Sequence, residues 1–131
     1  MKKSLLCLFA VVVAFSLAGC GPSKGQIALE KTYKDAMVTL NEAIKDLETA
    51  KNGDDAAKGL MKGMEALNKA KTQEEAIMKE HTVTESEALK KTQDDFMAVT
   101  EKFTNQMTTA AGKYSDNKKM QDALKKISEM K

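Results

Sequence analysis

The sequence predicts an all-α protein, an up-down antiparallel helical bundle with three long helices and a shorter fourth helix at the C-terminus. Three observations lead to this expectation. Apolar residues recur at intervals of three and four through most of residues 26–131, as they do on one face of an amphipathic helix. The only proline, Pro22, precedes this region, so no proline interrupts a long helix within it. No segment alternates apolar and polar residues between turn signals, as a half-buried strand would.

The first long helix is expected over residues 26–51. Its apolar face repeats at intervals of four, three, four and three in Tyr33, Met37, Leu40, Ile44 and Leu47. Three alanines run beside this face and favour the close approach of a neighbouring helix, namely Ala36, Ala43 and Ala50. Ser23 and Gln26 have the spacing of a capping box at the helix start. Asn52 and Gly53 indicate a C-terminal stop.

The second long helix is expected over residues 55–80. Its apolar face consists of Ala57, Leu60, Met61, Met64, Leu67 and Ala70. Residues 71–75 are polar throughout and have the form of a capping box, so they are candidates for a bend or a restart of the helix. Gly59 and Gly63 have the spacing of two small residues one turn apart, which favours close packing against the alanine flank of the first helix.

A break at residues 81–83 and a capping box over residues 84–87 are expected to precede the third helix. The apolar face of this helix consists of Leu89, Thr92, Phe96, Val99, Phe103, Met107, Ala110 and Tyr114. Gly112 or residues 114–115 are expected to end it, and one of the polar residues 115–116 to cap the short fourth helix. The fourth helix has an apolar side formed by Met120, Ala123, Leu124, Ile127 and Met130.

The N-terminus has the features of an export signal. Lys2 and Lys3 form a short positive segment, and residues 5–17 form an apolar run that only Ser16 interrupts. This run is shorter than the roughly 20 residues of a membrane-spanning helix and fits the hydrophobic part of a secretory signal. The run closes with Leu-Ala-Gly-Cys at residues 17–20, which resembles the lipobox of bacterial lipoproteins and matches it at all four positions.

The resemblance implies a processed and lipidated protein. In bacterial lipoproteins the cysteine thiol receives a diacylglycerol group, a peptidase cuts before the cysteine, and the new amine is often acylated. By resemblance, residues 1–19 are the signal peptide, Cys20 is the lipidated first residue, residues 20–25 are a tether and residues 26–131 are the bundle. Gly21, where this class uses Asp to retain a protein at the inner membrane, implies the outer membrane if the host has one.

Charge and cysteine content narrow the function further. The chain has 21 lysines, no arginine and 19 acidic residues; two of the lysines precede the lipobox, which leaves 19 positive and 19 negative side chains. A neutral chain without arginine lacks the guanidinium forks that bind phosphates and base edges, so no nucleic-acid partner is expected. Cys7 and Cys20 are the only cysteines, so the bundle has no disulfide and no thiol pair for zinc or covalent haem.

Four residues of the bundle are candidate ligands for a metal or a small molecule, namely Met61, Met64, Met78 and His81. Met61 and Met64 place two thioethers one turn apart, and thioethers select Cu(I). Both residues also continue the apolar face, and core packing is the favoured interpretation. Met78 lies three residues before His81, the only histidine, so the two could share a metal, whereas haem would need His81 to point into the core from a loop. An exposed histidine in a helix connection is the favoured alternative, and no cofactor is expected.

The sequence predicts no catalytic residues and no enzyme. It contains no Gly-rich phosphate loop, nucleophile elbow or calcium-binding loop. We expect a non-enzymatic, membrane-anchored envelope lipoprotein, a small helical interaction or structural module whose partner is another envelope protein or the cell wall. The alternative is an extracytoplasmic bundle that binds a small ligand, copper or haem. In the murein lipoprotein a C-terminal lysine is joined to peptidoglycan, and Lys131 occupies that place here, although the preceding residues differ.

Overall fold

The computed structural model describes residues 21–130, and within this range the chain contains helices and no strand. The four helices are α1 (Lys24–Thr49), α2 (Gly53–Glu80), α3 (Glu87–Lys113) and α4 (Lys118–Glu129). The predicted bundle of three long helices and a short fourth is therefore confirmed. The expected signal peptide, Cys20 and Lys131 lie outside the described residues.

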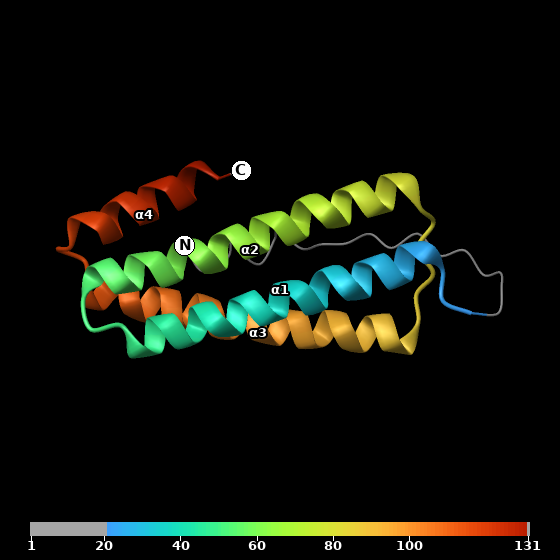
Figure 1. Ribbon diagram of the computed structural model, residues 1–131, viewed down its shortest axis with the longest axis horizontal. Coiled ribbons are helices and arrows are strands. Elements are labelled where there is room, and N and C mark those ends of the chain that lie inside the picture. Colours follow the sequence, from blue (N-terminus) through green and yellow to red (C-terminus); the bar gives the residue numbers. More distant parts are fainter. Residues whose placement is uncertain (1–20, 131) are drawn as a thin grey trace.

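Helices α1, α2 and α3 run alternately in opposite directions, so α1 and α3 point the same way (Figure 1). Helix α1 packs closely along both α2 and α3, whereas α2 and α3 approach each other less. Helix α4 folds back onto α2 and runs in the same direction as α2 (Figure 1). We call the end that carries the start of α1 and the α2–α3 loop the proximal end, and the opposite end the distal end.

Each helix begins after a residue whose side chain accepts a hydrogen bond from a backbone N–H three residues on. These N-caps are Ser23, Asn52, Ser86 and Asn117. The prediction was correct for Ser23, but α3 is capped by Ser86 rather than Thr84, and α4 by Asn117 rather than by a residue at 115–116. Because Ser, Thr, Asp and Asn all cap helices, a run of them marks a boundary without fixing its residue.

Helix α2 differs from the prediction in two places. Asn52 caps α2 rather than contributing to a stop of α1, and Gly53 is already helical, without a positive φ. Residues 71–75 continue the helix without a restart. The Thr72 hydroxyl donates to the carbonyl of Asn68 at 3.0 Å, one turn back, so it does not cap a new helix.

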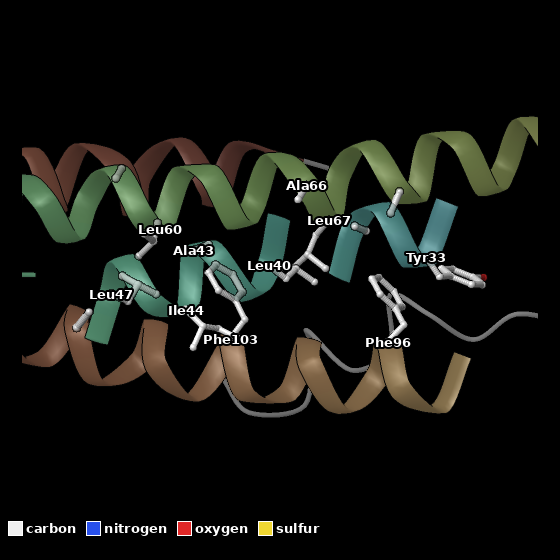
Figure 2. Packing of buried hydrophobic residues seen from close by; sticks show 14 of the residues in the cluster. Tyr33, Leu40, Ala43, Ile44, Leu47, Leu60, Ala66, Leu67, Phe96 and Phe103 are labelled. Atoms are coloured by element: carbon white, nitrogen blue, oxygen red, sulfur yellow. The ribbon is translucent and has the colours of Figure 1, made fainter. Parts of the chain in front are cut away.

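The predicted apolar faces meet in one core to which all four helices contribute. The rings of Tyr33 and Phe96 stack between α1 and α3, with centroids 5.0 Å apart and planes inclined by 26° (Figure 2). The largest fully buried side chains are Leu29, Leu40, Leu60, Leu89, Phe103 and Met120. Burial of this apolar surface, at about 25 cal/mol per Å², is the main force that holds the bundle together.

Two glycines of α2 allow two different helices to approach it. A Cβ atom on Gly59 would lie 3.0 Å from Cβ of Asp46 and 3.3 Å from the backbone nitrogen of Leu47, which confirms the predicted close contact with α1. A Cβ atom on Gly63 would lie 2.2 Å from ring atoms of Phe103 in α3. The expectation that both glycines face α1 is therefore wrong for Gly63, whose missing side chain leaves room for a buried ring.

Helix α4 is fixed to α2 at the distal end. Met120 and Ala123 are buried against α2, and Asn117 donates to the carboxylate of Asp54 at 3.1 Å. Lys119 forms an ion pair with the same carboxylate at 2.6 Å. The hydrogen bond from Lys119, and then that from Asn117, hold the pKa of Asp54 below its usual value. Gly53 makes this junction possible because a Cβ atom there would lie 2.4 Å from Asn117.

Candidate functional site

A shallow groove of about 760 Å³ lies at the proximal end, between the first three turns of α1 and residues 84–88. Gly21 and Pro22, the first described residues, line it together with Ile27 and Lys34 of α1. We call it the proximal groove. Gly21 directly follows Cys20 in the sequence, so this groove contains the described residue that is nearest in sequence to the predicted lipidation position.

Hydrogen bonds hold the start of α3 against the start of α1. The hydroxyl of Ser23 accepts from the backbone N–H of Gln26 at 3.1 Å and from that of Thr84 at 3.5 Å. The hydroxyl of Ser86 accepts from the N–H of Leu89 at 3.1 Å and from the side-chain amide of Gln26 at 2.6 Å. Gln26 is buried, so this amide bonds to protein in place of water. Sequence reasoning placed Gln26 in a capping box, whereas its side chain links α1 to α3.

Gly25 allows the α2–α3 loop to cross the first turn of α1. A Cβ atom there would lie 2.9 Å from Cβ of His81 and 3.1 Å from both the carbonyl oxygen of Thr82 and a methyl group of Val83. Val83 is buried, whereas His81 and Thr82 are exposed. The loop is therefore a packed part of the proximal end, with Val83 as its apolar contact to the bundle.

The proximal groove carries charges of both signs around an exposed apolar side chain. Lys31 forms an ion pair with Asp35, and Lys34 forms one with Glu30 at 3.6 Å, each within α1. Both lysines are well exposed, although Glu30 itself is only 19% exposed, and an exposed pair such as Lys31 with Asp35 contributes about 0–1 kcal/mol. Ile27 is 55% exposed beside them. This combination of weakly held lysines and a free apolar side chain suits contact with a surface rather than enclosure of a small molecule.

A buried acidic residue lies deeper at the same end. Glu74 of α2 is only 7% exposed, and burial raises the pKa of its carboxyl group. The hydroxyl of Tyr33 donates toward this carboxylate, and this hydrogen bond by itself lowers the pKa of Glu74. The pKa of Tyr33 is raised well above its usual value, first by burial and then by the charge of Glu74. Within the described residues Glu74 forms no ion pair, and the hydroxyl of Tyr33 is its polar contact.

The four candidate ligands do not form one site. Met61 and Met64 are partly buried and pack against the core. His81 is the exposed C-cap of α2, and its backbone N–H donates to the carbonyl of Ile77. Met64 and His81 are separated by about 26 Å of helix at 1.5 Å per residue. Met78 lies near His81 at the proximal end and is 36% exposed. The structure thus separates the pair in the core from the pair at the surface.

Two further findings concern residues 21–130. No helix in this range is both long and apolar enough to cross a bilayer. In the same range no three His, Cys, Asp or Glu side chains lie together as ligands for a metal ion.

Sequence reasoning missed the buried position of Glu74 and the role of Gln26. The polar run at 71–75 was interpreted as a possible restart, although Glu74 continues the spacing of Leu60, Leu67 and Ala70 on the buried face. That spacing was the available signal. The bond from Gln26 to Ser86 joins residues 60 positions apart, and no local pattern predicts it.

The fold thus places the chain in the broad class of all-α helical bundles. No family model matches the chain, and no curated protein or solved structure matches it significantly.

Proposed function

We propose that this chain is a non-enzymatic lipoprotein of the bacterial envelope, anchored through lipid on Cys20, and that its helical bundle binds another envelope component close to the membrane. The observation that carries the proposal is the lipobox at residues 17–20, which is followed by only three residues before α1 begins at Lys24. An export signal, a modifiable thiol and a folded domain therefore follow one another with almost no linker.

The short connection supports a role at the membrane surface. Four steps along the chain separate Cys20 from Lys24, and an extended chain covers about 14 Å over that number of residues. Each buried methylene of an acyl chain contributes about 0.8 kcal/mol, so two or three chains hold the protein durably. The bundle would thus act within reach of the lipid headgroups.

The surface of the bundle supports binding of a partner rather than of an enclosed ligand. The proximal groove is shallow, and exposed lysines and acids alternate around the helices. Four large apolar side chains are exposed among the described residues, namely Ile27, Val38, Met78 and Met97. Isolated exposed apolar residues are common on protein surfaces of every kind, so these four side chains are compatible with a partner but do not by themselves indicate one.

Replacement of the thiol tests the anchor. Cells that express the full chain are labelled with a fatty acid, and their membranes are separated. The wild-type protein and a Cys7→Ser variant are expected to carry label and to pellet with membranes, whereas Cys20→Ser carries no label. Label on Cys20→Ser, or none on the wild type, contradicts the proposal.

Photo-crosslinking in living cells tests the binding role. A crosslinking amino acid is placed in turn at exposed positions of the lipidated protein, for example Lys69 of α2 and Asp95 of α3. One discrete adduct with an envelope protein or with peptidoglycan, confined to neighbouring positions, is the expected result. Absence of an adduct from every exposed position contradicts a binding role.

A further inference from the structure

Helix α1 presents a stripe of residues that points away from the bundle. The stripe consists of Ile27, Lys31, Lys34, Val38 and Lys45, all exposed. Ile27 and Val38 are about three turns apart at 3.6 residues per turn, so they lie one above the other on the same face. They are 55% and 62% exposed, and they lie nearly opposite the buried residues Leu29 and Leu40. We call this set the α1 stripe.

The α1 stripe contains lysines and apolar residues but no acid. Three acids flank it: Glu30 and Asp35 pair with Lys34 and Lys31, and Glu42, which lies one turn from Val38 and from Lys45, pairs with Lys62 of α2. The exposed pair of Lys31 with Asp35 contributes little, and the ammonium group of Lys34, which is 61% exposed, lies 3.6 Å from Glu30, so both lysines can turn to other anions at small cost. A lysine side chain also lays its aliphatic stem on an apolar surface while its ammonium group stays in a polar layer. Ile27, Val38 and three lysines on one helical face thus have the composition of a contact with a lipid surface.

Gly21 and Pro22, which precede α1, lie on the same side of the bundle as the first part of the stripe. Gly21 and Pro22 line the proximal groove together with Ile27, Lys31 and Lys34. The described chain therefore begins beside the first turns of α1, in the groove that these turns form with residues 84–88. A lipid on Cys20, one residue before Gly21, would pull this face toward the membrane.

We propose that the α1 stripe is a membrane-contact surface, so that the lipidated bundle lies with α1 along the phospholipid surface. This inference rests on the lipidation of Cys20 proposed above. Ile27 and Val38 enter the boundary between headgroups and acyl chains, and the lysines meet the lipid phosphates. The outer faces of α2 and α4 then point away from the membrane and remain free for a partner.

Charge favours lipid over a second copy of the chain as the occupant of this face. A symmetric dimer through the α1 stripe would oppose two identical faces, each with Lys31, Lys34 and Lys45 along its centre and acids only at its flanks. Like charges opposed across an interface oppose association. Phospholipid phosphates, especially those of phosphatidylglycerol, carry the complementary sign.

Two matched cysteine variants test the orientation. Lys45 lies four residues before the end of α1 and Lys58 lies five residues after the start of α2, so both are near the distal end, and both are exposed on different helices. In the mature lipoprotein Cys20 is acylated and Cys7 has been removed, so Lys45→Cys and Lys58→Cys each carry a single free thiol for a nitroxide label. The labelled proteins are reconstituted in vesicles of phosphatidylethanolamine and phosphatidylglycerol.

Collision with oxygen and with a water-soluble nickel complex reports the surroundings of each label. The ratio of oxygen to nickel accessibility is expected to be roughly threefold higher at position 45 than at position 58, because only the first position lies at the lipid surface. In an upright bundle position 45 would stand about 30 Å from the start of α1 along the helix, in water. Equal ratios at the two positions overturn the inference.

A second set of variants tests the apolar residues themselves. Ile27→Glu with Val38→Glu is introduced into the Lys45→Cys protein, and Met97→Glu serves as the control because Met97 is 54% exposed on α3, away from the stripe. All three replaced side chains are exposed, so the helical circular dichroism is expected to stay unchanged. The double variant is expected to lower the accessibility ratio at position 45 to that of position 58, and the control to leave it unchanged. An unchanged ratio in the double variant overturns the inference.

Sedimentation with the vesicles separates this inference from the proposed function. If the wild-type protein pellets with vesicles and carries acyl label while the two ratios are equal, the anchor stands and the membrane-contact surface is wrong. If the wild-type protein carries no acyl chain, the proposed function and this inference are both wrong.

Discussion

Replacement of Gly63 by alanine is the sharpest test of how α2 and α3 meet. The added Cβ atom would lie 2.2 Å from two ring atoms of Phe103, whereas carbon atoms in contact are separated by about 3.5–4.0 Å. The ring or the whole of α3 would have to move by more than about 1 Å. Phe103 is fully buried, so its ring has little room to move aside.

Two opposing contributions set the size of the effect. Overpacking of a well-packed core costs about 1–3 kcal/mol, and a contact this short places Gly63→Ala at the upper end of that range. Alanine is a better helix former than glycine by about 1 kcal/mol, which offsets part of the loss. The expected net loss is about 2 kcal/mol in the free energy of unfolding, or roughly 10 °C in the midpoint of thermal unfolding.

Gly112→Ala is the matched control for this measurement. Gly112 also lies in a helix, but a Cβ atom there would meet nothing within 4 Å. We expect this variant to be more stable than the wild type by up to about 1 kcal/mol. Urea unfolding of the soluble chain starting at Gly21, followed by circular dichroism, measures both variants.

A result in which Gly63→Ala is as stable as the wild type would refute the close packing of Phe103 on α2. A double-mutant cycle tests whether the ring of Phe103 is what clashes with the added methyl group. If the ring is responsible, Phe103→Leu costs less in the Gly63→Ala background than in the wild type, because the smaller side chain relieves the overlap.

Three further predictions concern polar groups. Because the pKa of Glu74 is raised in the folded protein, the folded state binds more protons than the unfolded chain above about pH 4.5, so the stability of the wild type falls as the pH rises through this region. Glu74→Gln lacks this carboxyl group, so its stability relative to the wild type is expected to be higher at pH 7 than at pH 4. Urea unfolding at both pH values checks this, and a wild type that gains stability over Glu74→Gln on going to pH 7 contradicts it. Ser86→Ala removes the N-cap of α3 and the acceptor of the Gln26 amide, and lowers the free energy of unfolding by about 1–2 kcal/mol; Ser128→Ala, at an exposed site, is the control and changes it little. Asn117→Ala removes the N-cap of α4 and a bond to Asp54, so hydrogen exchange of α4 amides is expected to rise about tenfold or more, and unchanged exchange would exclude this role.

The helices could be predicted from sequence because each carries its own period. The spacing of Tyr33, Leu40 and Leu47 defines a buried face without any knowledge of what covers it. The ends of the helices were harder to predict, because several residues near each end can serve as a cap. Ser86 and Asn117 also form hydrogen bonds to other helices, with Gln26 and with Asp54, and these contacts cannot be seen in the local sequence.

The proximal groove could not be predicted in the same way. It depends on the crossing of the α2–α3 loop over Gly25 and on the bond from Gln26 to Ser86, both of which join residues far apart in the chain. The exposed face of α1 is different, because Ile27 and Val38 interrupt a polar surface at helical spacing that is visible in the sequence. The buried face of the same helix gives the stronger periodic signal, because it has more apolar residues than the exposed face.

The glycines that let neighbours approach α2 also bear on the order of assembly. Gly53, Gly59 and Gly63 all lie in this one helix, and the two in its interior, Gly59 and Gly63, each make helix formation less favourable than alanine would by about 1 kcal/mol. Alone, α2 would be a poor helix, and it becomes stable only when α1, α3 and α4 occupy the spaces that the glycines leave. The bundle should therefore form in one cooperative step in which α2 orders together with its neighbours, and a fragment that lacks α1 or α3 should leave α2 largely unfolded.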